Sequence, residues 1–171
     1  MNTSVRRLTR CAVLTALALA ISVAEGLIPL TILFPIPGLR LGIANLVTVY
    51  ALCCLSPKES FAILIARCTL GALVGGNLSA LAFSLTGGIL AFLVTWLMLH
   101  VGGLSLFGVC IAGAAAHNTG QVLAAVVVLG SPAIAVYLAP LLLASLVTGT
   151  ATGAASILLV QRVPQLNKTM Y

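Results

Sequence analysis

The chain has 171 residues, of which 61% are hydrophobic and 6% are charged, and its mean hydropathy is +1.25. A soluble domain carries about 25% charged residues, so the composition excludes a water-soluble globule. Eight Lys and Arg residues against two Glu residues give a formal net charge of +6, and the sequence contains no Asp. The lack of Asp excludes a site built from several aspartates and Mg²⁺. We therefore expect an all-α polytopic membrane protein whose function depends on its few polar residues.

Six apolar runs, separated by Pro, Gly and charged residues, predict six transmembrane helices in a single transmembrane domain over residues 1–171. A membrane-spanning helix needs roughly 20 apolar residues, and helices satisfy their own backbone groups in lipid. The predicted helices comprise residues 8–28, 41–55, 59–74, 78–99, 105–129 and 133–160. The second and third are short, so we expect one or both to tilt little or to be broken. Pro140 predicts a bend in the sixth.

The distribution of Lys and Arg predicts a protein of the inner (cytoplasmic) membrane with both termini in the cytoplasm. The basic residues on the cytoplasmic side are then Arg6, Arg7, Arg10, Lys58, Arg162 and Lys168. Only Arg40 lies at an outer end, and Arg67 lies within the third helix. The first run also resembles a secretory signal peptide cleaved near Ala20. Because the run continues to Ile28, long enough to span, we favour a retained membrane helix.

Polar residues gather in the outer half of the predicted bundle. A polar group in hydrocarbon costs a few kcal/mol, so such residues usually face an interior cavity and mark a substrate path. His117 and Gln121 are four residues apart and share one helix face. We predict a substrate-binding cavity lined by Arg40, Asn45, Asn77, His117, Asn118 and Gln121. The alternative is that these groups only pair with one another, with Glu25 bonded to Arg40.

The segment of residues 29–39 is apolar and contains three prolines. An exposed loop is rarely this apolar, so we expect a lid that folds back over the cavity, with Glu25, Pro37 and Gly38 as lid or clasp residues. Arg67 is the costliest single placement. It either snorkels to an interface or anchors an anion. Because neither Glu is near it in predicted depth, an uncompensated Arg favours an anionic ligand.

The residues that usually carry chemistry are sparse. The five cysteines, Cys11, Cys53, Cys54, Cys68 and Cys110, are odd in number and form no C-x-x-C pair, so we expect neither a disulfide framework nor a metal site. The sequence has no phosphate-binding loop, no H-E-x-x-H and no G-x-S-x-G motif. We therefore expect no enzyme activity, no cofactor, no nucleic-acid partner and no transport powered by this chain's own ATP hydrolysis.

Ala12, Ala16 and Ala20 repeat every four residues on the first predicted helix. Small residues at this spacing let another helix approach closely. We expect either a partner-protein surface or internal packing at this stripe.

Residues 37–45 (PGLRLGIAN), followed downstream by residues 117–121 (HNTGQ), resemble the Gx transporter family, whose members are often labelled heptaprenyl diphosphate synthase component I. The resemblance extends from about Arg6 to Val160. This family is in turn similar to the substrate-binding S components of energy-coupling factor transporters. Those proteins have six helices, cytoplasmic termini, an outward-facing pocket capped by the loop after the first helix, and an alanine repeat on that helix.

The resemblance implies capture of a small molecule outside the cell, followed by docking onto a transmembrane coupling subunit with cytosolic ATPases. We expect a membrane-embedded binding and uptake protein for a small anionic molecule. The alternative is a non-catalytic accessory subunit of heptaprenyl (polyprenyl) diphosphate synthesis. Prenyl diphosphate synthases hold Mg²⁺ and diphosphate with aspartate-rich motifs, which a chain without Asp does not supply.

Overall fold

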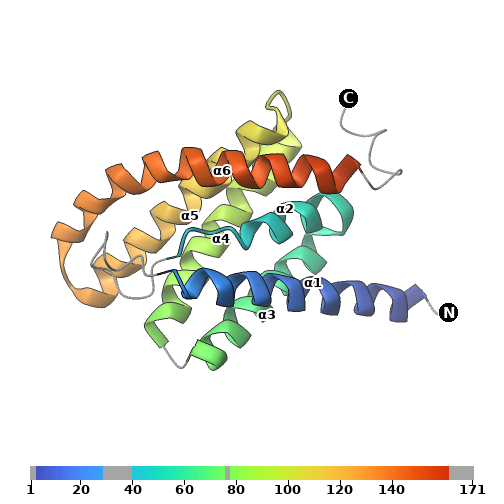
Figure 1. Ribbon diagram of the computed structural model, residues 1–171, viewed down its shortest axis with the longest axis horizontal. Coiled ribbons are helices and arrows are strands. Elements are labelled where there is room, and N and C mark those ends of the chain that lie inside the picture. The colour runs from blue at the N-terminus through green and yellow to red at the C-terminus, as the bar shows by residue number, and fades with distance from the viewer. Residues whose placement is uncertain (1–2, 29–39, 76–77, 162–171) are drawn as a thin grey trace.

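The fold is a helical bundle, known here from a computed structural model that describes residues 3–28, 40–75 and 78–161. Within these residues the elements are α1 (Thr3–Gly26), α2 (Asn45–Cys54), α3 (Pro57–Gly75), α4 (Leu78–Val101), α5 (Leu106–Leu129), the 3₁₀ helix η2 (Pro132–Tyr137) and α6 (Leu138–Gln161). Figure 1 shows α1 and α6 along opposite sides of the bundle, with α2, α4 and α5 between them. The predicted all-α class is confirmed.

Four segments of the described chain are long and apolar enough to cross a membrane: Val5–Gly26, Leu78–Val101, Leu106–Leu129 and Pro132–Gln161. α3 has 19 residues, which is close to a spanning length, but it carries Lys58, Glu59 and Arg67. α2 has only 10 residues. Membrane crossing by α2 and α3 remains a prediction.

The largest differences from the sequence prediction lie in three helices. α1 begins at Thr3, five residues before the expected start at residue 8. The expected helix of residues 41–55 begins four residues later, at Asn45. The expected helix of residues 133–160 is divided between η2 and α6, so the change lies after Tyr137 and not at Pro140. Pro140 lies in the first turn of α6, where a backbone N–H has no intrahelical partner to lose.

Close helix contacts depend on glycine. A Cβ atom on Gly120 of α5 would lie 2.7 Å from the Thr86 carbonyl oxygen and 2.8 Å from Cα of Gly87, both in α4. A Cβ atom on Gly149 of α6 would lie 2.5 Å from Cα of Ile111 in α5. Small residues let helix backbones approach this closely. The three helices α4, α5 and α6 therefore form the tightly packed part of the bundle.

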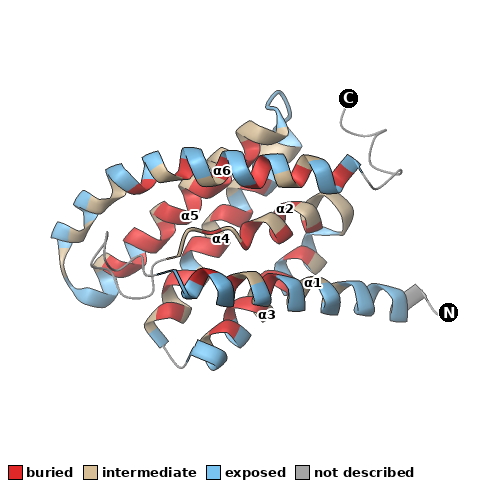
Figure 2. Cartoon of the chain, viewed as in Figure 1, coloured by how far each residue is buried: buried red, intermediate tan, exposed pale blue. Residues whose placement is uncertain are grey.

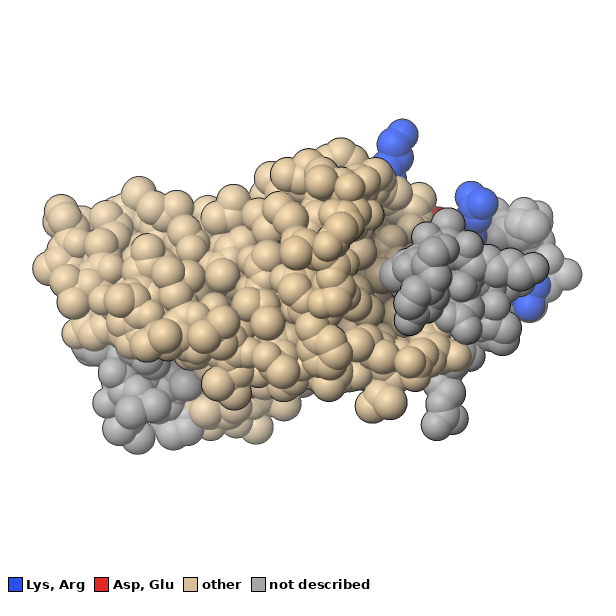
Figure 3. Space-filling model, turned by 90° about the horizontal axis from the view of Figure 1, so that it is seen from above, with Lys and Arg blue, Asp and Glu red and all other residues tan. Residues whose placement is uncertain are grey.

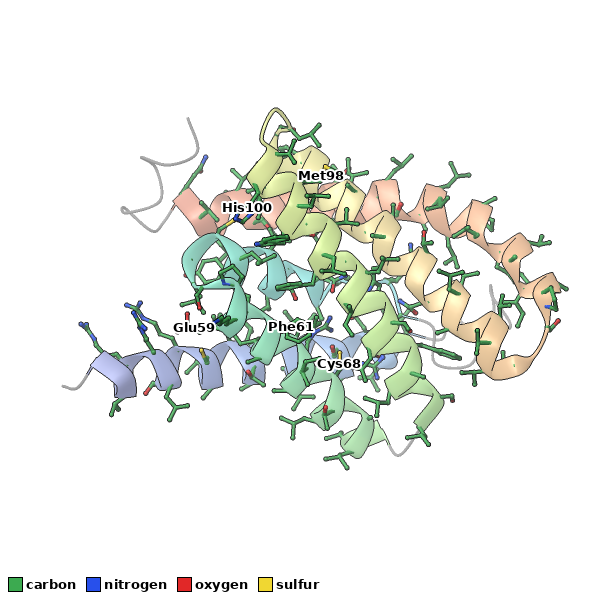
Figure 4. The ribbon with its side chains drawn as sticks, turned by 180° about the vertical axis from the view of Figure 1, so that it is seen from behind. Glu59, Phe61, Cys68, Met98 and His100 are labelled. Carbon is green, nitrogen blue, oxygen red and sulfur yellow. The ribbon has the colours of Figure 1, made fainter. Side chains whose placement is uncertain are left out.

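α3 is attached to α4 by two side chains that Figure 4 labels. The ring of Phe61 meets that of Phe92 edge to face, with centroids 5.3 Å apart. The Cys68 thiol donates to the Ser84 carbonyl oxygen at 3.5 Å. On its other side α3 meets α1 and α2 through a buried cluster, Ala18, Val47, Ala51 and Ile63. α3 thus joins α1 to the tightly packed helices.

The outer surface is apolar. Large side chains such as Val127, Leu73 and Val147 are 73–80% exposed, and Figure 2 shows exposed residues along the outer faces of α1 and α6. In Figure 3 the Lys and Arg side chains lie at one end of the visible face, and the remainder is almost free of charge. Such a surface suits contact with lipid, because hydrocarbon chains do not hydrate charged groups. The chain is an integral membrane protein.

Candidate functional site

α2 is a short helix with non-helical backbone in front of it. At a rise of 1.5 Å per residue its 10 residues extend about 15 Å, half of the roughly 30 Å hydrocarbon core. Residues 40–44 are not helical. Non-helical backbone at membrane depth needs hydrogen-bond partners within the protein. The partners of the N–H and carbonyl groups in this segment therefore identify the residues that surround it.

The first turn of α2 is satisfied partly by its own chain and partly by α1. The N–H groups of residues 45–47 donate to the carbonyl oxygens of residues 42–44 over 2.9–3.2 Å. Ala44 is the N-cap residue and has no side-chain acceptor. The N–H of Ile43 donates instead to Oε1 of Glu25, and the same carboxylate interacts with the N–H of Ala44. Glu25 of α1, 4% exposed, therefore caps α2.

Arg40 is held by α5 and α1. Its backbone N–H donates to Oε1 of Gln121 at 2.9 Å, and Nε2 of Gln121 donates back to its carbonyl oxygen at 2.9 Å. The Arg40 guanidinium donates to the Ser22 carbonyl oxygen at 3.3 Å. The side chain of Arg40 is therefore directed towards α1, and its bond is to a neutral group.

Arg67 lies inside the bundle. It is 4% exposed, and its guanidinium donates to Oγ of Ser22 at 3.2 Å and to Oδ1 of Asn45 at 3.0 Å. Its Nε atom has no hydrogen-bond partner among the described residues. Arg67 therefore does not snorkel towards an interface. It links α3 to α1 and α2 through neutral partners.

The expectation that neither Glu lies near Arg67 is wrong, since Glu25 interacts electrostatically with both Arg67 and Arg40. Glu25 is expected near the outer face because it lies at the end of a predicted helix that starts at residue 8, whereas α1 begins at Thr3. Its first turns extend past the neighbouring helices (Figure 1). Residues 22–25 therefore lie level with the middle of α3. No hydrogen bond joins Glu25 to Arg40 among the described residues, because each side chain has the other partner given above.

His117 of α5 adds a buried imidazole to this group. It is 3% exposed, and neither ring nitrogen has a hydrogen-bond partner of normal geometry among the described residues. Gly42, whose φ of +80° suits glycine, lies against the ring: a Cβ atom there would be 2.7 Å from Cδ2 of His117 and 3.0 Å from Nδ2 of Asn45. That Asn45 nitrogen also lacks a partner.

The cluster carries more positive than negative charge. The sequence contains two acidic side chains, Glu25 and Glu59, and Glu59 is in the exposed first turn of α3, bonded to Ser56. Two guanidinium groups therefore surround one carboxylate, which gives 2 − 1 = +1 with the imidazole neutral. No group of three His, Cys, Asp or Glu side chains lies together in the described part of the chain. The unpartnered Arg and Asn nitrogens are hydrogen-bond donors, which suit an anion.

The structure brings most of the predicted site residues together. Glu25, Arg40, Asn45 and Gln121 are linked through the bonds described above, and His117 lies against Gly42 beside Asn45. Asn118 is directed elsewhere: its amide donates to the Leu141 carbonyl oxygen of α6 at 2.8 Å. Asn77, Pro37 and Gly38 lie outside the described residues.

Sequence reasoning missed two members of the cluster, Ser22 and Gly42. It considered Arg67 as the anchor of an anion but did not place it in the predicted cavity lining. Ser22 precedes Glu25 by three residues and so shares its helix face, a signal that was available. The predicted stripe of Ala12, Ala16 and Ala20 is exposed on α1. Its use as a partner surface remains a prediction.

Comparison with known proteins gives one family. The family model described as heptaprenyl diphosphate synthase component I matches residues 14–159. No curated protein and no solved structure matches the chain. The matched range includes Glu25, Arg40, Arg67 and Gln121, and it covers most of the sequence. The chain therefore belongs to the heptaprenyl diphosphate synthase component I family, as its resemblance in residues 37–45 and 117–121 predicted.

Proposed function

We propose that this chain is a non-catalytic membrane protein that binds a small anionic molecule and takes part in its uptake, in the manner of an S component. The observation that carries the proposal is Arg67, buried inside the bundle and hydrogen-bonded, within the described residues, only to the neutral side chains of Ser22 and Asn45. Together with Arg40 it leaves the cluster one positive charge in excess. The substrate-binding residues are Arg40, Asn45, His117 and Gln121, with Arg67 added.

An anion in this cluster is favoured by the energetics of buried charge. An isolated charge in a low-dielectric interior costs several kcal/mol, and buried donors left without acceptors cost about 1–3 kcal/mol each. A ligand with one negative charge would balance the excess and accept from Nε of Arg67 and Nδ2 of Asn45. A neutral ligand would satisfy the donors but leave the charge.

The proposed topology places both termini in the cytoplasm of a cell with an inner membrane. Arg6, Arg7 and Arg10 at the start of α1 and Lys58 at the start of α3 are exposed, and Arg7 interacts electrostatically with Glu59. These basic residues therefore share one end of the bundle, which the positive-inside rule assigns to the cytoplasm. The exposed Ala12, Ala16 and Ala20 lie on the same helix, available to a transmembrane coupling subunit with cytosolic ATPases.

Binding to the purified protein in lipid nanodiscs tests the proposal. The probes are vitamins, flavins and isoprenoid precursors in charged and neutral forms, each measured against wild type, Arg67→Met and the exposed control Arg10→Gln. We expect an anionic probe to bind wild type and Arg10→Gln and to bind Arg67→Met at least about 10-fold more weakly, since a hydrogen bond to a charged group contributes about 1.5–3 kcal/mol. Absence of binding by every probe, with normal uptake after deletion of the gene, would contradict it.

The family description favours a second candidate, an accessory membrane subunit of heptaprenyl diphosphate synthesis. The chain contains no Asp, so a partner would supply the aspartate-rich site for Mg²⁺ and diphosphate. Affinity purification from native membranes separates the two functions. Recovery of a soluble aspartate-rich synthase subunit supports this candidate, and recovery of ATPases with a coupling subunit supports uptake.

A further inference from the structure

Both carboxylate side chains of this sequence cap a helix, but in different surroundings. Glu59 belongs to the helix that it caps: it accepts from the N–H of Ser56 at 2.9 Å, and its own N–H donates to Oγ of Ser56 at 3.3 Å. That capping box is exposed. Glu25 comes from α1, 18 residues before Ile43 in the chain, and is buried. Its carboxylate occupies the N-terminus of a helix to which it does not belong.

The surroundings of the Glu25 carboxylate are those of an anion-binding site. A helix N-terminus carries a partial positive charge, and here the N–H groups that face the carboxylate belong to Ile43 and Ala44, the two residues that precede α2. The guanidinium groups of Arg40 and Arg67 add positive charge nearby.

Independent observations point to a ligand at this end of α2. Nδ2 of Asn45, the first residue of the helix, and Nε2 of His117 are unpartnered among the described residues, in side chains that are 8% and 3% exposed. Both lie against Gly42, immediately before the capped N–H groups. Nε of Arg67 is a further unpartnered donor. The described cluster therefore holds more donor capacity than Glu25 uses.

We propose that the N-terminus of α2, flanked by Arg40 and Arg67, is a carboxylate-binding site that the side chain of Glu25 fills from within the chain. The occupant is a single carboxylate group, because the site already holds one, that of Glu25, against the N–H of Ile43 and beside that of Ala44. This inference rests on the proposed function and deepens it: an anionic ligand that displaces Glu25 from these N–H groups presents a carboxylate, whereas free formate does not compete with a side chain held in place by the chain itself.

Removal of the internal carboxylate tests the site without knowledge of the natural ligand. In Glu25→Ala the N–H groups of Ile43 and Ala44 lose their acceptor and a space of carboxylate size opens. The probes are formate and acetate, compared with their neutral counterparts formamide and acetamide, at constant ionic strength. The measurement is the thermal midpoint of the protein in nanodiscs. We expect formate to raise the midpoint of Glu25→Ala by about 3 °C or more at concentrations well above its Kd.

Matched variants locate the effect. Wild type gains nothing from formate, because Glu25 fills the site. Glu59→Ala gains nothing either, because its lost cap is exposed to water. Glu25→Gln fills the space without the charge, so we expect a lower midpoint than wild type and no recovery with formate. It also carries the test if Glu25→Ala does not fold: a Glu25→Gln protein as stable as wild type overturns the proposal.

The remaining outcomes are also decisive. Equal recovery of Glu25→Ala by formamide and formate, or no recovery by either, overturns the carboxylate site. If formate raises the midpoint of Glu25→Ala but wild type binds no probe in the ligand survey, the carboxylate site is upheld and the proposed function is overturned. If wild type binds an anionic probe but formate does not raise the midpoint of Glu25→Ala, the proposed function is upheld and the carboxylate site is overturned.

Discussion

Gln121 and Arg40, 81 residues apart in the chain, are joined by a reciprocal pair of hydrogen bonds, each 2.9 Å long. The carboxamide of Gln121 satisfies both the N–H and the carbonyl oxygen of Arg40, as a neighbouring strand would. This pair attaches the non-helical segment of residues 40–44 to α5. Glu25 attaches the same segment to α1 through the N–H of Ile43. The segment is therefore clamped from two sides, which fixes where Asn45 and α2 begin.

The first prediction concerns this attachment. Gln121→Leu removes both bonds and leaves two partly buried backbone groups of Arg40 unpaired, at up to about 1–3 kcal/mol each. We expect faster amide hydrogen exchange in the peptide that covers residues 40–46. Gln121→Glu is the matched variant: it keeps an acceptor for the N–H but loses the donor, so its exchange lies between Leu and wild type. If amide exchange in Gln121→Leu is as slow as in wild type, the two hydrogen bonds between Gln121 and Arg40 do not stabilise this segment.

The second prediction separates stability from binding at Arg67. Removal of the Arg67 charge leaves the guanidinium of Arg40 to balance the carboxylate of Glu25, so no uncompensated buried charge remains. Arg67→Met nevertheless leaves Ser22 and Asn45 without their donor. We expect a loss of less than about 2 kcal/mol in unfolding free energy together with the loss of anion binding. Arg67→Lys keeps the charge without the planar fork that reaches two partners, so it should recover binding only in part. Full binding by Arg67→Met would remove Arg67 from the site.

The third prediction tests the close contact of α4 and α5. A Cβ atom on Gly120 would meet backbone atoms of Thr86 and Gly87 at 2.7–2.9 Å, and backbone cannot rotate away as a side chain can. Gly120→Ala should therefore lower the unfolding free energy by about 1–3 kcal/mol. Gly108→Ala in the same helix meets side-chain atoms at 3.6 Å or beyond and should gain up to about 1 kcal/mol from helix propensity. Thermal unfolding in detergent measures both, and equal effects would contradict the packing described.

The fourth prediction concerns topology. A single cysteine at Ser131, in the connection between α5 and η2, should react with a membrane-impermeant thiol reagent added outside the cell, in a protein whose native cysteines are replaced. A single cysteine at Lys58, at the start of α3, should react only after the membrane is permeabilised. The reverse pattern would invert the proposed orientation.

The sequence predicted the class of this protein because hydrophobicity and charge are local properties. Long apolar runs identify membrane helices wherever they lie in a bundle. The short run of residues 41–55 was recognised as too short for an ordinary span, yet its helix begins only at Asn45. No local signal gives that start, because the cap of α2 is Glu25 of another helix and not its own N-cap residue, Ala44.

The candidate site was predicted in part, for the same reason. Polar residues in hydrocarbon are few, so Arg40, Asn45, His117 and Gln121 were recognisable by type and approximate depth. Asn118 is adjacent to His117 in sequence, but one helical step turns it towards Leu141 of α6. Ser22 shares a helix face with Glu25, but that spacing does not indicate its bonds to both arginines, which come from other parts of the chain.

Composition alone determined that the chain is an α-helical membrane protein with two carboxylate side chains and no Asp, and therefore without an aspartate-rich Mg²⁺ site. Only the tertiary structure decided what those carboxylates do. Glu25 and Arg67 were expected at different depths, but the extension of α1 beyond its neighbours brings them into one buried group. Charge balance inside a bilayer depends on distances between helices, because a low-dielectric interior makes each unpaired charge costly. Those distances are set by packing of helices far apart in the chain, which no local pattern in the sequence records.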